Sequence, residues 1–146
     1  MFDGCTSLSN ANIVLSATTL VDSCYAQMFT GCTSLASAPV ISAQTAAIRS
    51  CWSMFEGCAS LTQAPVLHAT SLAQYCYQYM FRNCTHLSSV EVKFTSWPYS
   101  TSTSNWLNNV ASNGTFTCPT ALGTNETITR GANNCPANWT VVNLDA

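Results

Sequence analysis

The chain has 146 residues, of which 47% are hydrophobic and only 7% charged, and its formal net charge is −2 at pH 7. This length suffices for one domain with a core, and the high hydrophobicity with low charge excludes a disordered chain. Without a surplus of Lys and Arg, the chain is not expected to bind DNA or RNA. It also has no run of 18 apolar residues, so we predict no membrane insertion.

A motif of eight residues recurs along residues 1–93. It begins at Met1, Met28, Met54 and Met80, so successive copies are 27, 26 and 26 residues apart. The second copy reads Met-Phe-Thr-Gly-Cys-Thr-Ser-Leu. A constant period between about 20 and 50 residues is typical of proteins whose repeats stack along one axis. We therefore predict a solenoid of about four repeats, the first of them incomplete.

Apolar residues after each motif follow the spacing Leu-x-x-Leu-x-Leu, which predicts one short parallel strand per repeat and a single stacked sheet. These residues are Leu8, Ala11, Ile13, Leu35, Ala38, Val40, Leu61, Ala64, Val66, Leu87, Val90 and Val92. Pro39 and Pro65 fall inside the same segments. Because proline donates no hydrogen bond to a neighbouring strand, we expect strands of only about two to four residues there.

A helical spacing follows each strand. Apolar residues four positions apart recur as Leu20, Cys24 and Met28, and again as Leu72, Cys76 and Met80. This spacing places each set on one face of a helix. Gly31 and Gly57 come just after these segments, where a left-handed residue often ends a helix. The predicted fold class is therefore α/β, with a strand, a turn, a helix and a turn in each repeat.

Residues 28–40 and 54–66, which combine Met-Phe-x-Gly-Cys with Ala-Pro-Val, resemble the BspA-like leucine-rich repeats. Such repeats occur in surface proteins of gut and oral bacteria, in some parasitic protists and in phage of gut bacteria. The resemblance covers residues 1–93. It implies a right-handed solenoid with a parallel sheet on one side, and it implies surface display and adhesion without specifying a ligand.

Four of the nine cysteines hold the same repeat position: Cys5, Cys32, Cys58 and Cys84. We expect these thiols to be buried, reduced and stacked as small hydrophobic groups, and prefer this to disulfide bridges. Seven residues separate Cys24 from Cys32, whereas zinc sites usually have about two to four between paired ligands. No metal and no cofactor is therefore predicted.

The period stops near Phe94, and residues 94–146 are predicted to form a C-terminal cap that includes β-strands. The end of a stack exposes apolar core that must be covered. We therefore expect Trp97, Trp106 and Trp139 to pack into this core, with carbohydrate binding on aromatic faces as the alternative. Cys118 and Cys135 are expected to be unpaired, although a bridge between them remains an alternative.

No set of residues with catalytic spacing occurs, so we predict that the protein is not an enzyme. The two histidines, His68 and His86, lie at repeat positions that other copies fill with Ser or Ala, and the six carboxylates are scattered. The candidate binding residues instead form two rows on the sheet face. The predicted apolar row is Val14, Ile41, Leu67 and Lys93, and the predicted polar row is Asn10, Ser37, Gln63 and Ser89. The alternative is that these scattered aliphatic side chains have no binding role.

The functional hypothesis is a non-enzymatic surface module for adhesion that binds a protein or a glycan through its repeat face. The alternative is a structural component of a phage virion or extracellular filament. The expected location is extracellular or at the cell surface, or alternatively in a virion. Because the motif begins at Met1, in mid-repeat, we also expect a further repeat, protomer or partner to cover the N-terminal edge near residues 11–14.

Overall fold

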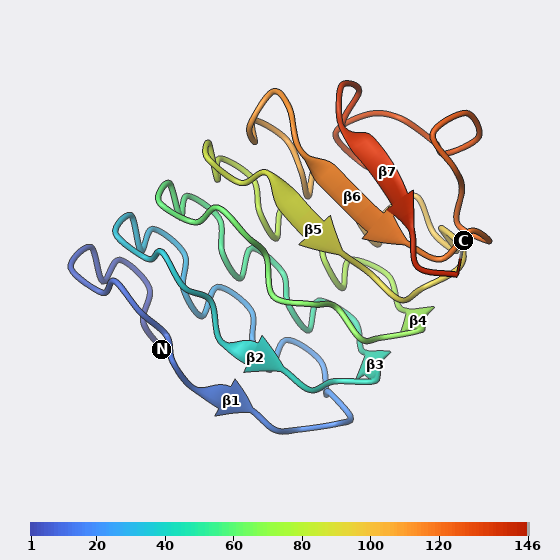
Figure 1. The fold of residues 1–146 in the computed structure, drawn as a ribbon. Helices are drawn as coiled ribbons and strands as arrows, with labels where there is room; N and C mark the ends of the chain where they lie inside the picture. The colour runs from blue at the N-terminus through green and yellow to red at the C-terminus, as the bar shows by residue number, and fades with distance from the viewer. Residues whose placement is uncertain (146) are drawn as a thin grey trace.

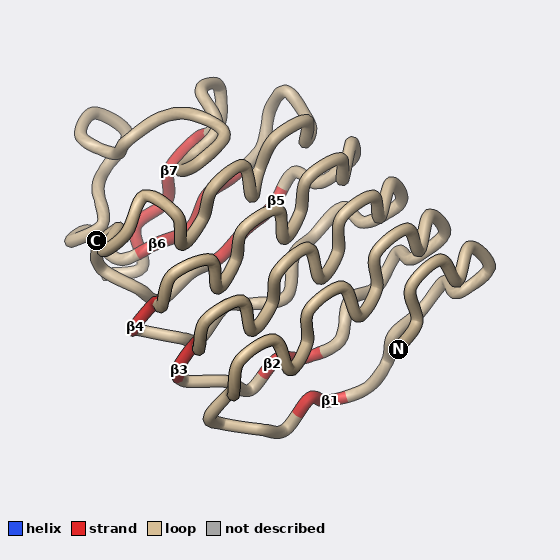
Figure 2. Tube along the Cα trace, turned by 180° about the vertical axis from the view of Figure 1, so that it is seen from behind, coloured by secondary structure: helices blue, strands red, loops and turns tan. Residues whose placement is uncertain are grey.

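The computed structural model describes residues 1–145 and shows successive repeats of about 26 residues lying side by side (Figure 1). We number the repeats 1 to 4 from Met1, Met28, Met54 and Met80. The strands are β1 (Val14–Leu15), β2 (Val40–Ile41), β3 (Thr45–Ala46), β4 (Ser71–Leu72), β5 (Ser89–Glu91), β6 (Thr115–Cys118) and β7 (Thr140–Asn143). In each repeat, strand segments such as β1, β2 and β5 lie opposite the runs of turns, whereas β3 and β4 lie at the edge where the turns begin (Figure 2).

The strands form three small parallel sheets, not the single sheet that we predicted. β1 pairs with β2, β3 pairs with β4, and β5, β6 and β7 form the third sheet in that order. β2 has two residues and begins directly after Pro39, whereas the strands of the third sheet have three or four residues. Pro39 and Pro65 keep pairing short in repeats 2 and 3, because proline donates no bond to a ladder.

The predicted α/β fold, a leucine-rich-repeat solenoid with one helix per repeat, is wrong. None of residues 1–145 lies in a helix, and the strands are confined to three small sheets. The segments predicted to be helical are runs of β-turns. We call each run a turn ribbon; the four ribbons are residues 22–31, 48–57, 74–83 and 100–109.

Hydrogen bonding explains why a turn ribbon is not a helix. Alternate amides close β-turns, as when Met28 N–H donates to the Tyr25 carbonyl over an N···O distance of 3.2 Å. The amides between them donate to the next repeat, as when Phe29 N–H donates to the Met54 carbonyl at 2.8 Å. An α-helix needs both kinds of amide for its own i to i−4 bonds. The neighbouring repeat therefore takes half of the donors that a helix would require.

Left-handed backbone recurs every fourth residue of a turn ribbon, as at Ser23, Gln27 and Gly31. The residues with positive φ that are not glycine are Ser23, Gln27, Arg49, Ser53, Tyr75, Tyr79, Asn83, Asn105 and Asn109. For residues with a Cβ atom this conformation costs about 1–2 kcal/mol each. Backbone bonds to the neighbouring repeat hold most of these residues, such as Ser23, Gln27 and Tyr79, in a conformation that a helix does not contain.

Gln27→Gly is expected to stabilise the protein by up to about 1 kcal/mol, because glycine relieves left-handed strain. Gln27 is exposed and has a φ of 56°, so the substitution opens no cavity. The matched control is Ala26→Gly, since Ala26 does not have a positive φ. Glycine there is expected to destabilise by about 0.5–1 kcal/mol. Urea denaturation measures both variants, and destabilisation of the same size in both would contradict the left-handed assignment.

Side chains of one type stack in columns through the core. Phe2, Phe29, Phe55 and Phe81 lie ring over ring, with neighbouring centroids 5.4 to 5.5 Å apart and planes within 14° of each other. A column places equivalent residues of successive repeats in contact. The period of the sequence therefore specifies the core, although it does not specify the local backbone.

The cysteine column behaves as predicted for buried thiols. Cys32, Cys58 and Cys84 are fully buried and unpaired. Each Sγ donates a hydrogen bond to the phenylalanine carbonyl of the preceding repeat, with S···O distances of 3.0 to 3.2 Å. Cys5, at the end of the column, is exposed. The expected burial is thus confirmed for the three cysteines that have a repeat on each side.

The stack continues beyond Phe94, where the sequence period ends. Phe81 N–H donates to the Trp106 carbonyl at 3.0 Å, repeating the pattern of the earlier repeats, and β6 and β7 extend the sheet of β5. Trp106 and Trp139 are buried, as predicted for the C-terminal segment, and Trp97 is half-buried. Residues 94–145 thus cover the C-terminal side of the stack with tryptophan-rich core.

Candidate functional site

The predicted apolar row is not exposed as a whole. Val14 is 62% exposed, but Ile41 and Leu67 are only 4% and 1% exposed, so these two residues belong to the core. The pairing of β1 with β2 places Val14 beside Val40, not beside Ile41. Because successive side chains of a strand point to opposite faces, a shift of one residue turns Ile41 inward.

The exposed apolar row consists instead of Val14, Val40 and Val66, which we call the valine row. Val40 is 54% exposed, and Val66 is half-buried at the edge of a groove. In the next repeat the row ends in an ion pair, where Lys93 Nζ lies 2.6 Å from Glu91 Oε1. A charged pair therefore follows the apolar side chains of the valine row in repeat 4.

The predicted polar row lies in register on the same face. Asn10 forms a parallel bridge with Ser37, and Gln63 forms one with Ser89. Asn10, Ser37 and Gln63 are exposed, whereas Ser89 is half-buried. The row therefore consists of two paired halves, and no bridge among the described residues joins Ser37 to Gln63.

Hydrogen bonding between repeats is interrupted where the strand segments of repeats 2 and 3 face each other. Repeats 1 and 2 are paired through β1 and β2, and repeats 3 and 4 through two bridges. Between repeats 2 and 3, the equivalent bonds would join Val66 N–H to the Pro39 carbonyl and His68 N–H to the Ile41 carbonyl. Neither bond forms within residues 1–145. The ladder is therefore open at this point.

A bulge in repeat 3 explains the interruption. Gln63 pairs with Ser89 and Leu67 pairs with Val92, so repeat 3 has one residue more than repeat 4 between the two pairs. Pro65 lies in this longer segment and has no N–H to donate. An extra residue bends a strand and locally disrupts its ladder. The bulged segment consequently leaves the ladder with repeat 2.

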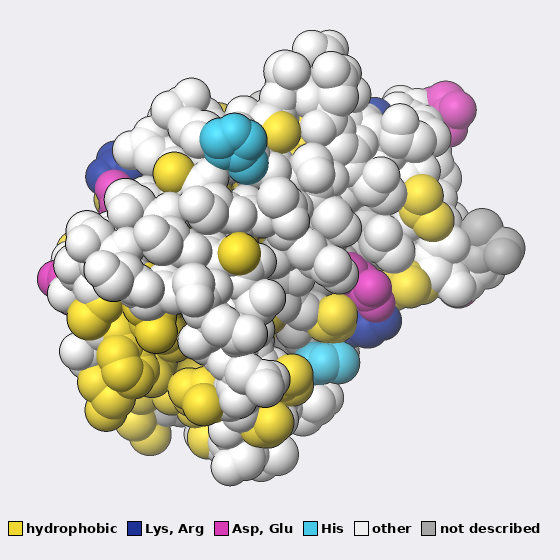
Figure 3. All heavy atoms as spheres, turned by 60° about the vertical axis from the view of Figure 1, so that its left-hand side comes forward, with side chains coloured by type: hydrophobic (Ala, Val, Ile, Leu, Met, Phe, Trp, Pro, Cys, Tyr) yellow, Lys and Arg dark blue, Asp and Glu magenta, His cyan; other side chains and the backbone are white. Residues whose placement is uncertain are grey.

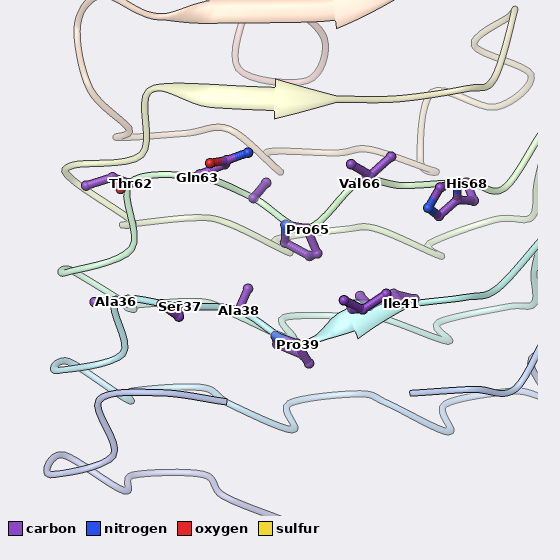
Figure 4. A pocket seen from close by; sticks show the side chains of 12 residues that line it. Ala36, Ser37, Ala38, Pro39, Ile41, Thr62, Gln63, Pro65, Val66 and His68 are labelled. Carbon is purple, nitrogen blue, oxygen red and sulfur yellow. The ribbon is translucent and has the colours of Figure 1, made fainter. Parts of the chain in front are cut away.

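A groove of about 370 Å³ lies at the open ladder, between repeats 2 and 3 (Figure 4). Its lining residues are Ala36, Ser37, Ala38, Pro39, Val40, Ile41, Thr62, Gln63, Ala64, Pro65, Val66 and His68. Apolar side chains such as Val40 and Val66 share this lining with polar groups of Ser37, Gln63 and His68, a mixture found in binding sites. We did not predict this groove; the sequence signal for it is a pair of prolines, Pro39 and Pro65, at equivalent positions of two adjacent repeats.

Cysteine and histidine side chains often act in catalysis, but here Cys58 and Cys84 are buried in the core and His86 forms a hydrogen bond within the fold. Burial raises the pKa of Cys58 to about 12 and also raises the pKa of Cys84, which keeps both thiols protonated at neutral pH. His86 Nδ1 lies 2.7 Å from the Ala59 carbonyl oxygen. Within residues 1–145, no three His, Cys, Asp or Glu side chains gather as metal ligands would.

Because the buried thiols resist ionisation, the free energy of unfolding is expected to fall at alkaline pH. Burial raises the pKa of Cys58 from 9.0 to about 12, so the unfolded chain releases this proton at a lower pH than the folded chain does. The stabilisation is complete below about pH 9 and is lost as the pH rises towards about 12. We therefore expect the melting temperature of the reduced protein to fall in this window, and to fall less steeply in Cys58→Ala. Cys5→Ala, which removes an exposed thiol, is the control, and equal slopes in both variants would contradict the prediction.

No protein-family model, curated protein or solved structure matches the chain. The part of the chain that the structure describes contains no helix long and apolar enough to cross a membrane. The strand-bearing face, with its valine row and groove, is therefore the basis for the function proposed next.

Proposed function

We propose that the chain is a non-enzymatic, surface-displayed module that adheres to a protein ligand through the valine row and the adjoining groove. The observation that carries this proposal is an exposed apolar row beside a groove of about 370 Å³ on one face of the molecule. Charged side chains are few on the surface, as Figure 3 shows for one view. Adhesion therefore depends on apolar contact and hydrogen bonds.

The valine row supports protein binding because clustered exposed apolar residues mark interaction surfaces. Val14 and Val40 are in register on paired strands, so their side chains point to the same side. The groove beside them has room for an apolar side chain of the partner, and side chains inserted in pockets contribute much of the affinity at protein interfaces. The same contact would remove both valines from water.

Backbone and side-chain polar groups supply hydrogen bonds at the edge of this apolar contact. The amides of Val66 and His68 lack the bonds that a complete ladder would give them. Ser37 and Gln63 are exposed along the groove. A polar rim around an apolar centre is the usual arrangement of a protein interface. The groove therefore provides donors and acceptors for a partner's main chain as well as a place for a side chain.

Selection of displayed random peptides on the immobilised protein tests the proposal. Selected peptides are expected to bind the double variant Val14→Asp, Val40→Asp at least about tenfold more weakly, because charge is then placed in an apolar contact. Val21→Asp is the matched control, since Val21 is 69% exposed and lies outside the valine row. Peptide titration is expected to shift the amide resonances of residues 37–41 and 63–68.

Two outcomes would overturn the proposal. One is selection of peptides that bind the double variant and the wild-type protein equally. The other is concentration-dependent self-association through the valine row, measured by light scattering and abolished in the double variant. The second result would assign the row to contacts between copies of the chain, as in a structural assembly.

A further inference from the structure

A second cavity, of about 270 Å³, lies in the C-terminal part of the stack and shares no residue with the groove. We call it the C-terminal pocket. Its lining residues are Trp97, Tyr99, Ser100, Thr103, Thr129, Asn133 and Asn134. Two segments of the chain therefore build it, the loop and turn ribbon after β5 and the loop that precedes β7.

Hydrogen bonds fix these two segments to each other. Thr103 Oγ1 donates to the Asn133 carbonyl at 2.7 Å, and Asn105 N–H donates to Asn133 Oδ1 at 2.7 Å. Trp106 Nε1 donates to the Asn134 carbonyl at 2.9 Å. The walls of the C-terminal pocket are thus held in place before any ligand arrives, which lowers the entropic cost of binding.

The lining is aromatic and polar but carries no charge at neutral pH. Arg130, which is adjacent to Thr129 in sequence, has its guanidinium occupied elsewhere. It donates to the Trp139 carbonyl at 2.6 Å, the Pro136 carbonyl at 3.2 Å and the Asn125 carbonyl at 3.1 Å. The C-terminal pocket therefore has no group that would recognise an anion or a cation.

Several polar groups around the C-terminal pocket have unused hydrogen-bonding capacity. Among residues 1–145, the side chains of Tyr99, Thr129 and Asn134 have no hydrogen-bond partner. Tyr99 and Thr129 are exposed and Asn134 is half-buried, so each side chain is free to form a hydrogen bond with a ligand in the pocket.

We propose that the C-terminal pocket binds one ring of a neutral saccharide. A sugar ring presents both C–H faces, which pack on aromatic side chains such as Trp97 and Tyr99, and hydroxyl groups, which pair with amides and hydroxyls such as those of Asn134 and Thr129. The volume of about 270 Å³ is below the usual range for drug-sized ligands, so it suits a single ring. This site extends the proposed function from protein adhesion to glycan recognition without depending on the valine row.

Saturation-transfer NMR with a panel of neutral sugars (glucose, galactose, mannose, fucose, N-acetylglucosamine and N-acetylgalactosamine) tests the proposal. At least one sugar is expected to receive saturation and to shift the indole N–H resonance of Trp97, which Trp97→Phe assigns. Asn134→Ala and Tyr99→Ala are expected to weaken binding by about tenfold or more, because each removes a ligand contact. Asn138→Ala, at an exposed asparagine outside the pocket, is the control and is expected to bind as wild type.

The proposal is overturned if no neutral sugar binds, or if Asn134→Ala and Tyr99→Ala bind with wild-type affinity while remaining folded. Tighter binding of sialic or glucuronic acid than of every neutral sugar would also overturn it, because the lining has no cation for a carboxylate. Val14→Asp, Val40→Asp is expected to leave sugar binding unchanged. Failure of this site and failure of the valine row are therefore distinguishable.

Discussion

Phe55→Ala is expected to lower the free energy of unfolding by about 3–5 kcal/mol, the usual cost of removing a buried phenylalanine. Phe55 is fully buried, and its ring stacks between Phe29 and Phe81 with centroid distances of 5.4 and 5.5 Å. Truncation removes a ring from the middle of a column, and repeats on both sides limit how far the gap can close. Urea denaturation followed by tryptophan fluorescence measures the loss.

Phe2→Ala is the matched control for the column. Phe2 is half-buried and has one stacked neighbour, Phe29. We expect its loss to be clearly smaller, about 1–2 kcal/mol, because less apolar area leaves contact. If Phe55→Ala and Phe2→Ala destabilised the protein equally, stacking through the column would not be what holds the repeats together.

The second large effect is expected at the C-terminal side of the stack, where Trp106→Ala should cost about 3–5 kcal/mol. Trp106 is fully buried, and Nε1 donates to the Asn134 carbonyl at 2.9 Å. Its ring centroid lies 6.2 to 6.3 Å from those of Tyr77, Phe81, Phe94, Trp97 and Phe116. The substitution therefore creates a cavity and also leaves a carbonyl without its donor.

Two further variants separate these contributions. Trp106→Phe keeps an aromatic ring but loses the indole donor, so its cost is expected to be intermediate. Trp52→Ala removes a half-buried tryptophan from a turn ribbon and is expected to cost less than Trp106→Ala. Thermal unfolding of all three compares them directly. Equal losses for Trp52→Ala and Trp106→Ala would contradict the view that Trp106 anchors the C-terminal core.

The stacked columns were predictable from the sequence because equivalent residues of successive repeats meet whatever the local backbone is. The turn ribbons could not be distinguished from helices in the sequence, since apolar residues four positions apart fit both structures. Leu72, Cys76 and Met80 suit one face of a helix, but they suit equally a turn ribbon that repeats every four residues. No glycine marks the left-handed positions Tyr75 and Tyr79, although Tyr79 N–H donates to the Ser104 carbonyl of the adjacent turn ribbon.

The candidate site was predictable only in part. The register of Asn10 with Ser37 could be predicted because both residues lie before the position that Pro39 occupies in repeat 2. The apolar row was misplaced by one residue, and in a strand one residue exchanges the buried and exposed faces. In repeats 3 and 4, Leu67 rather than Val66 pairs with Val92, because Pro65 belongs to a bulge. A bulge depends on the partner strand, which one repeat read alone does not reveal.

Amide hydrogen exchange resolved by NMR tests most directly the central claim that the ladder between repeats 2 and 3 is open at the groove. Val40 and Leu67 N–H donate to the Ile13 and Glu91 carbonyls, each at 3.0 Å, and are expected to exchange slowly. The amides of Val66 and His68, which flank Leu67, are expected to exchange faster by orders of magnitude, because neither has a partner in repeat 2. Protection of Val66 and His68 equal to that of Leu67 would show a continuous ladder and contradict the account.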